Sequence, residues 1–240
     1  MKTALITGSS GAIGSSTVEK FIENGYFVVG GFNKNEKKAK TLETRFKDRF
    51  FGFKADLKDE KEVRALYGFT EKNFGHVDAL ILNAGVGLYK LFTETETAEW
   101  DEVFNVNVRS SYLLAKLCLP EMIRRERGKI VFVSSVWGKV GASMETAYSA
   151  SKAALIGLTR ALAKEVSPSG VTVNCVCPGV IKSEMNARFS EKEIKELALN
   201  TPVRKIGEPQ DVAELIYYLA SEKADFITGQ DFSVDGGFGL

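Results

Sequence analysis

Tyr148 and Lys152 stand four positions apart in the stretch "ETAYSASKAAL", with only Ser149, Ala150 and Ser151 between them. Residues four apart share one face of a helix, so the phenol and the ammonium would lie side by side. A phenol can donate a proton to a substrate, and a neighbouring cation favours its ionised form. The same pair is ordinary surface in many helices, so the rest of the chain must decide between the two readings.

The composition describes a globular chain without a charge bias. Of its 240 residues 44% are hydrophobic and 26% charged, and 32 basic residues face 31 acidic ones. This balance predicts neither a nucleic-acid partner nor a membrane-surface partner. The opening stretch "MKTALITGSS" lacks the apolar core of a signal peptide, and no apolar run approaches the length that spans a bilayer. We therefore expect a cytoplasmic protein.

The cysteines and the histidine argue against a disulfide framework or a metal site. Cys118, Cys175 and Cys177 are odd in number and lack C-x-x-C spacing, which favours reduced, buried thiols. In a strand, Cys175 and Cys177 would share a face, where packing explains them. The one histidine, His76, leaves no second imidazole for a multi-histidine site, and we expect no metal.

Short apolar runs alternate with longer segments of helical period. We expect strands at 3–7, 27–31, 50–53, 79–83, 129–135, 171–177 and 231–236, and helices near 13–24, 34–47, 59–74, 100–125, 147–166 and 209–220. This alternation predicts one α/β domain over residues 1–240. It would be a Rossmann-type doubly wound sheet of seven mainly parallel strands with helices on both faces. Such sheets bind ligands outside the carboxyl ends of their strands.

A glycine-rich turn, "LITGSSGAIGSS", leads from the first expected strand into the first expected helix. Gly8, Gly11 and Gly14 would let the backbone approach phosphate oxygens, and the helix N-terminus would offer unpaired N–H groups. Three glycines could also make nothing more than a close strand–helix turn. Their position at the start of a βαβ unit favours nucleotide binding.

The end of the second strand bears on which cofactor is bound. An NAD site often places an acid about 20 residues beyond the glycines, to bind the adenosine ribose. Here Phe32 occupies that neighbourhood, and the first acid is Glu36. Asn33 and Lys34 are instead suited to a 2′-phosphate. We expect NADP(H), with NAD(H) as the alternative.

Six motifs occur together in one order: "TGSSGAIG", "LNAG", "NVNV", "VSS", "YSASK" and "NCVCPG". Together they resemble the short-chain dehydrogenase/reductase family over essentially the whole chain. The ending from "PVRKIGEPQDVA" onward is similar to the 3-oxoacyl-acyl-carrier-protein reductases within that family. The resemblance implies NADPH-dependent reduction of a 3-oxoacyl thioester and a homotetramer, with segments 100–125 and 147–166 pairing between subunits.

The resemblance also assigns four catalytic roles. Tyr148 would protonate the substrate carbonyl oxygen, while Lys152 lowers the pKa of that phenol and holds the nicotinamide ribose. Ser135 would bond the same carbonyl oxygen, although Ser134 could equally take the capping role that a serine has there. Asn107 would interrupt its helix and anchor a water in a proton relay to the lysine.

The remaining residues that the resemblance implies would contact the cofactor. They are Gly8, Ser10, Gly11, Ile13 and Gly14 at the phosphates, Asn33 and Lys34 at the 2′-phosphate, Asp56 and Leu57 beside the adenine, Asn83, Ala84 and Gly85 beneath the adenosine, and Pro178, Gly179, Ile181 and Ser183 around the nicotinamide. Two positions depart from the usual pattern. Ala12 replaces a glycine, and Gly11 stands where NADP users often carry a basic residue, which counts against NADP.

Two segments would shape the substrate pocket. They are residues 85–99 after the fourth strand and residues 180–200 after the sixth, the second amphipathic and suited to a mobile lid. Trp137, Met144, Met185 and Phe189 are candidate apolar walls that are equally credible as core residues. A basic patch at 124–129 could steer an acidic acyl carrier protein. Glu126 and Ser169, however, align with carrier-docking arginines of the similar reductases and cannot replace them.

Three other readings remain open to test. A hydrolase would need an activated nucleophile with a base, and His76 precedes the fourth strand, at the wrong edge for such a site. A non-catalytic nucleotide-binding sensor would be expected to lose Tyr148 or Lys152, and both are present. The same chemistry could also act on a 3-hydroxyacyl-CoA, a steroid, a sugar or a quinone-like carbonyl.

Overall fold

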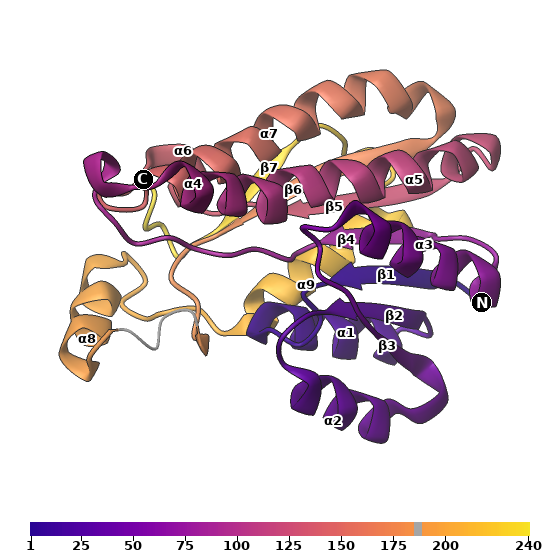
Figure 1. Ribbon diagram of the computed structural model, residues 1–240, viewed down its shortest axis with the longest axis horizontal. Coiled ribbons are helices and arrows are strands. Elements are labelled where there is room, and N and C mark those ends of the chain that lie inside the picture. Colours follow the sequence, from indigo (N-terminus) through magenta and orange to yellow (C-terminus); the bar gives the residue numbers. More distant parts are fainter. Residues whose placement is uncertain (185–188) are drawn as a thin grey trace.

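The computed structural model describes residues 1–184 and 189–240, and its centre is a seven-stranded parallel sheet (Figure 1). The strands are β1 (Thr3–Thr7), β2 (Phe27–Phe32), β3 (Phe50–Lys54), β4 (Ala79–Leu82), β5 (Gly128–Val133), β6 (Val171–Pro178) and β7 (Asp231–Val234). Their order is β3-β2-β1-β4-β5-β6-β7, so the chain reverses direction across the sheet between β1 and β4. Every pairing is parallel, which confirms the expected doubly wound sheet.

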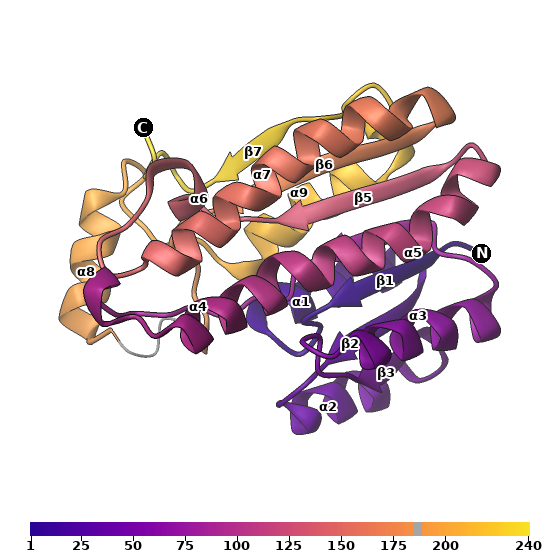
Figure 2. The same ribbon diagram turned by 45° about the horizontal axis from the view of Figure 1, so that its top comes forward.

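Helices cover both faces of the sheet (Figures 1 and 2). The described helices are α1 (Ala12–Glu23), α2 (Glu36–Phe46), α3 (Glu60–Phe74), α4 (Thr97–Phe104), α5 (Ser110–Arg124), α6 (Trp137–Val140), α7 (Thr146–Val166), α8 (Glu191–Asn200) and α9 (Pro209–Ala220). Apolar residues of α3, α5 and α7 form one core with the sheet, and those of α1, α2 and α9 form the other. None of the helices within the described residues is long and apolar enough to cross a membrane.

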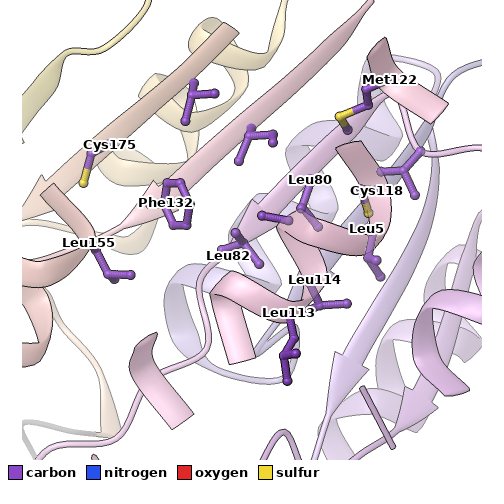
Figure 3. Packing of buried hydrophobic residues seen from close by; sticks show 14 of the residues in the cluster. Leu5, Leu80, Leu82, Leu113, Leu114, Cys118, Met122, Phe132, Leu155 and Cys175 are labelled. Carbon is purple, nitrogen blue, oxygen red and sulfur yellow. The ribbon is translucent and has the colours of Figure 1, made fainter. Parts of the chain in front are cut away.

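The central strands are buried on both faces, as their continuous apolar sequences require. In β1 the side chain of Leu5 enters one core, while Ala4 and Ile6 enter the other. Figure 3 shows the first of these cores, where Leu80 of β4 and Leu114 of α5 lie close to Leu5. The alternating side chains of one strand therefore hold both helix layers on the sheet.

Several elements differ from the expected boundaries, most of them by one or two residues; the expected strand at 231–236, for example, ends at Val234. The expected helix at 100–125 is two helices, α4 and α5, joined by a π-helical turn at Asn105–Arg109. The expected strands at 79–83 and 129–135 end earlier, at Leu82 and Val133, so Asn83 and Ser135 lie in the loops that follow. The short helix α6 and helix α8 lie where no helix was expected.

Candidate active site

The expected site residues all follow the carboxyl ends of strands or lie on the helices beside them. Because every strand is parallel, these ends form one edge of the sheet, here called the carboxyl edge. The structure places there Gly8, Ser10, Gly11, Ile13 and Gly14 after β1, Asn33 and Lys34 after β2, Asp56 and Leu57 after β3, Asn83, Ala84 and Gly85 after β4, Ser135 after β5, and Gly179, Ile181 and Ser183 after β6, which ends at Pro178.

Tyr148 and Lys152 lie in the first two turns of α7 and are nearly inaccessible, with exposed fractions of 8% and 3%. The ammonium Nζ of Lys152 lies 5.6 Å from the centre of the Tyr148 ring. The small residues between them leave room at this surface of the helix. The spacing seen in the sequence is therefore a real juxtaposition of a phenol and a cation.

The side chain of Lys152 crosses from α7 to the end of β5. Its Nζ donates a hydrogen bond of 2.8 Å to the carbonyl oxygen of Val133. Burial lowers the pKa of Lys152 from 10.5 to about 8, and the nearby thiols of Cys175 and Cys177 oppose this shift. A lysine with this pKa can change its protonation state near neutral pH, which an exposed lysine cannot do.

The two serines after β5 have different partners. Ser134 Oγ donates to the backbone oxygen of Lys152 at 2.7 Å, which fastens the middle of α7 to the end of β5. Ser135 Oγ accepts a hydrogen bond of 3.1 Å from the backbone N–H of Trp137. Accepting that bond leaves the Ser135 proton available for a substrate oxygen. The geometry favours Ser135 over Ser134 as the substrate-facing hydroxyl.

Asn107 lies in the π-helical turn and is fully buried. Its amide pairs with the backbone of Val86 in both directions, at 2.8 and 3.0 Å, and its Nδ2 also donates to Ser151 Oγ at 2.9 Å. π-Helical turns occur frequently at functional sites. The expected interruption of the helix is confirmed, and the side chain ties the loop after β4 to α7.

The glycine turn after β1 is closely packed. Gly8 has φ +65°, and a Cβ at Gly14 would lie 2.0 Å from the Gly8 oxygen. No side chain caps the start of α1, whose N-cap is Gly11, so the first N–H groups of this helix are left for a ligand. The turn fits a cofactor's phosphates, and the Ala12 departure leaves the helix start intact.

Asn83 serves this turn more directly than the sequence suggested. Its Nδ2 donates to the backbone oxygens of Thr7 and Gly8 at 3.0 and 3.2 Å. The hydroxyl of Thr7 in turn accepts the N–H groups of Asn83 and Ala84, each at 3.0 Å. The amide of Asn83 thus braces the glycine turn against β4, and its expected place beneath the adenosine stays a prediction.

The part of the edge that follows β2, where the adenosine is expected, is exposed and basic. Asn33 and Lys34 follow β2 and are open to solvent. Glu36, the first acid, pairs with Lys40 at 2.7 Å and with Lys54 at 3.7 Å. The Lys40 ammonium, and then Lys54, hold the pKa of this carboxyl below its usual range. This first acid after β2 is thus already paired with cations.

The segment after β6 is tied to its neighbours by the backbone. Pro178 accepts a hydrogen bond from Val136 N at 2.8 Å, and Gly179 N donates to Val234 O at 3.0 Å. Ile181 forms a bridge with Gly207. Ser183 lies in a partly exposed stretch beyond them. Met185, one of the expected pocket walls, lies outside the described residues.

The basic patch expected to steer a carrier protein lies at the opposite, amino end of the strands. Lys129 is the second residue of β5, whereas Ser135 follows the end of this strand. Each of the four cations is paired with an acid of the same chain: Arg124 with Glu121, Arg125 with Asp78, Arg127 with Glu222, and Lys129 with Asp225. Within one subunit, this patch therefore offers neither free charge nor proximity to the site.

His76 lies at the same amino end, with Nε2 3.4 Å from Asp78 Oδ2. It is separated from Ser135 by the length of the sheet, so it cannot serve that serine as a base. Sequence reasoning missed two neighbours of Lys152. Ser134 was weighed only as a cap, and Gly138, where a Cβ would lie 2.8 Å from the Lys152 carbonyl carbon, gave no signal.

Known proteins resemble this chain over almost its whole length. The family model described as enoyl-(acyl carrier protein) reductase matches residues 8–239. The chain is 39% identical to the uncharacterized oxidoreductase YmfI of Bacillus subtilis (strain 168), over 99% of this chain and 98% of that protein. It is 34% identical to the 3-oxoacyl-[acyl-carrier-protein] reductase FabG of Buchnera aphidicola subsp. Baizongia pistaciae (strain Bp), over 98% of this chain and 96% of that protein.

A solved structure extends the likeness to three dimensions. The crystal structure of a proposed gluconate dehydrogenase from Agrobacterium tumefaciens has a TM-score of 0.93 and 26% sequence identity, covering 99% of this chain and 96% of that one. The chain therefore belongs to the short-chain dehydrogenase/reductase family, whose oxidoreductases use NAD(P)(H). Its relatives carry several different names, so the family alone does not choose the substrate.

Proposed function

We propose that this protein reduces the 3-oxo group of an acyl thioester with NADPH, giving the 3-hydroxyacyl product. The observation that carries the chemistry is the buried pair of Tyr148 and Lys152, with Lys152 Nζ 5.6 Å from the phenol ring. The choice of substrate is supported by the full-length likeness to 3-oxoacyl-[acyl-carrier-protein] reductase FabG.

NADPH, when bound, supplies a hydride to the carbonyl carbon. Tyr148 then donates its phenolic proton to the carbonyl oxygen, so the product is an alcohol and the tyrosine is left as a phenolate. The Ser135 hydroxyl bonds the same oxygen and holds it in reach. The ammonium of Lys152 stabilises the phenolate, and burial of both residues keeps water from competing.

Asn107 has a positioning role in this proposal. Its amide holds Val86 and Ser151, so it fixes the loop after β4 against the face of α7 that carries the lysine. The expected proton relay would pass through this region toward Lys152. Tyr148→Phe and Lys152→Ala separate the roles, because the first removes only the proton and the second also weakens ribose binding.

We propose NADPH rather than NADH because of the residues that follow β2, where the adenosine is expected to bind. Lys34 is exposed beside the expected 2′-phosphate, and Glu36 is held by Lys40 and Lys54. The glycine at Gly11 argues the other way. Lys34→Ala should weaken NADPH binding about tenfold and leave NADH binding unchanged, since one phosphate contact is lost. Lys72→Ala, an exposed lysine of α3, is the control, and intrinsic fluorescence reports both titrations.

The substrate assay compares NADPH oxidation with acetoacetyl-acyl carrier protein, acetoacetyl-CoA, a steroid ketone and a sugar-derived ketone. Faster turnover of the carrier-bound thioester supports the full proposal. Equal turnover of both thioesters removes the carrier preference, which is its weaker half because the basic patch is internally paired. Turnover of only the steroid or the sugar removes the thioester. Cofactor binding without any turnover would favour a sensor.

We also propose a cytoplasmic homotetramer that pairs through α5 and α7. Tyr112 and Ile123 of α5 are 46% and 39% exposed, which leaves apolar surface for a second subunit. The three cysteines are free and buried, as a reducing compartment allows. Light scattering at micromolar concentration tests the assembly, and a stable monomer would contradict it.

A further inference from the structure

The segment that follows β7, residues 235–240, folds back over the carboxyl edge. Asp235 holds it in place: Oδ1 accepts the N–H of Gly237 at 3.0 Å, and Oδ2 accepts the N–H of Gly239 at 3.1 Å. Gly236 and Gly237 have φ values of +62° and +85°, which favour glycine over residues with a Cβ. This is a fixed turn built around one carboxylate.

The 235–240 segment touches the turn after β5 and the segment after β6. A Cβ at Gly239 would lie 2.7 Å from Val136 Cγ2, so the backbone passes directly over the residue next to Ser135. A Cβ at Gly179 would lie 2.6 Å from the Asp235 Cβ. Val136 adjoins Ser135, the proposed catalytic serine, and Gly179 is one of the residues expected around the nicotinamide.

The same segment also touches the chain that leaves α8. Val203 N donates to the oxygen of Gly236 at 3.2 Å. A Cβ at Gly237 would lie 3.0 Å from Pro202 Cγ. Segment 180–200, which includes α8, was expected to close over the substrate. The 235–240 segment is therefore anchored between the serine-bearing turn and the end of that element.

At the centre of the segment, the ring of Phe238 meets the indole of Trp137 edge to face, with centroids 5.4 Å apart at 76°. The backbone N–H of Trp137 is the group that bonds Ser135 Oγ at 3.1 Å. Both aromatic side chains are partly exposed rather than buried in the core. The apolar pair is thus carried by the residue whose backbone N–H bonds the hydroxyl that would hold the substrate oxygen.

We propose that Phe238 and Trp137 form the apolar wall against which the acyl carbons next to the reduced carbonyl lie, and that Phe238 is a specificity-determining residue. This inference rests on the proposed function. Ligand sites combine apolar and aromatic walls with a few polar groups that fix orientation. Here the polar groups are Ser135 and Tyr148, and the wall is held at a fixed distance from them by Asp235.

The wall must be rigid to select among acyl chains of different length, because a flexible wall would move aside for the longer ones. The two carboxylate bonds of Asp235 and the glycine contacts supply this rigidity. A ring that served only to fill the core would be buried, whereas Trp137 and Phe238 are both partly exposed. The two roles can be told apart by experiment. Truncating a core ring lowers the stability of the protein, whereas truncating a pocket wall changes the ratio of kcat/KM between substrates.

The experiment compares Phe238→Ala and Phe238→Leu with the parent protein on acetoacetyl-CoA and 3-oxooctanoyl-CoA, with NADPH. We expect Phe238→Ala to raise the ratio of kcat/KM for the longer over the shorter substrate about tenfold, since the volume of several methylene groups is opened. Phe238→Leu should give an intermediate ratio. The control is Phe226→Ala, whose fully exposed ring precedes β7 at the amino end of the sheet.

If both Phe238 variants keep the parent's ratio of kcat/KM and only their melting temperature falls, the proposed role of Phe238 as a pocket wall is wrong. If the parent reduces no thioester, the proposed function fails separately, and the same ratio is then measured with ethyl acetoacetate and ethyl 3-oxooctanoate. A changed ester ratio would uphold the wall for another acyl class. An unchanged ester ratio, or no reduction of either ester, would overturn the wall as well.

Discussion

The two ends of the sheet differ in whether their cations are paired with acidic side chains. At the amino end, Lys2 and Arg127 share Glu222, while Arg125 pairs with Asp78 and Lys129 with Asp225. At the carboxyl edge, the most buried cation is Lys152. Within the described part of the chain it has no carboxylate partner, and its ammonium bonds only a backbone carbonyl. One end neutralises its cations, and the other keeps one unneutralised.

This difference separates stability from chemistry along the strands. Exposed ion pairs of the kind at the amino end contribute about 0–1 kcal/mol each, so most of them tolerate change. A buried ammonium without a counter-charge destabilises the folded state, which the lowered pKa of Lys152, about 8, reports. Proteins tolerate such a loss of stability at residues that are needed for function. This contrast predicts that substitutions at the amino end lower stability and spare activity, whereas substitution of Lys152 lowers activity and raises stability.

The largest expected effect is at Tyr148. Replacing it by phenylalanine removes the proposed proton donor and keeps the ring, so kcat should fall about 10³-fold. Cofactor affinity should stay within about twofold, because the ring position over Lys152 is retained. Steady-state reduction and a fluorescence titration with NADPH measure the two quantities. Full activity in this variant would disprove the role of Tyr148.

Lys152→Met should lose most activity and yet gain stability. Burial lowers the pKa of Lys152 from 10.5 to about 8, and this shift corresponds to about 3 kcal/mol of penalty for the charged form. The lost hydrogen bond to Val133 offsets about 1 kcal/mol, so we expect a net gain of about 2 kcal/mol at pH 7. Urea unfolding measures it, and a loss of stability would contradict the argument.

The same variant tests the pH dependence. Between pH 8 and 10.5 the unfolded chain binds one proton more at Lys152 than the folded protein does, so the free energy of unfolding rises with pH across this window. Below pH 8 both states are protonated and the penalty is constant. Lys152→Met should abolish that slope. Lys164→Met, an exposed lysine of the same helix, should retain it.

At the amino end, Asp78→Ala should lower stability and spare activity. The Asp78 carboxylate accepts hydrogen bonds from Thr3 N and from Arg125, each at 2.8 Å, and is almost fully buried. Its removal leaves a partly buried guanidinium unpaired, which should cost about 2–3 kcal/mol. Arg124→Ala, which breaks an exposed pair, should change stability by less than about 1 kcal/mol. Urea midpoints and kcat distinguish the outcomes.

The sequence predicted the sheet well because its signals are local. Seven apolar runs separated by helical periods leave little choice of topology once crossovers are right-handed and parallel. The break between α4 and α5 was weakly signalled by Asn107, which disfavours a helix interior. Helix α6 was missed because its four residues, Trp137–Val140, show no period. Helix α8 was read only as an amphipathic segment.

The pair of Tyr148 and Lys152 could be noticed from residue type and spacing, whereas the choice of Ser135 came from the family resemblance. The structure brings all three to one edge of the sheet, and their catalytic roles stay predictions. Residues that act through packing contacts could not be identified from the sequence. Ser134 and Gly138 hold Lys152 through its own backbone, and Phe238 reaches Trp137 from about a hundred residues away. Such contacts arise from the fold and leave no spacing in the sequence.

The smallest predicted loss of activity concerns Gly85, which the sequence placed beneath the adenosine. A Cβ at this position would lie 3.1 Å from Lys152 Nζ and 3.4 Å from Asn107 Oδ1, closer than most such contacts. Gly85→Ala should displace the ammonium by a few tenths of an ångström and lower kcat about tenfold, since catalytic geometry tolerates little misplacement. Gly87→Ala is the matched control, because its Cβ would meet no atom within 4 Å. Equal kcat in the two variants would show that the loop after β4 yields and that the Lys152 position is not set by Gly85. A tenfold difference with equal unfolding midpoints would place the effect at the ammonium rather than in the stability of the fold.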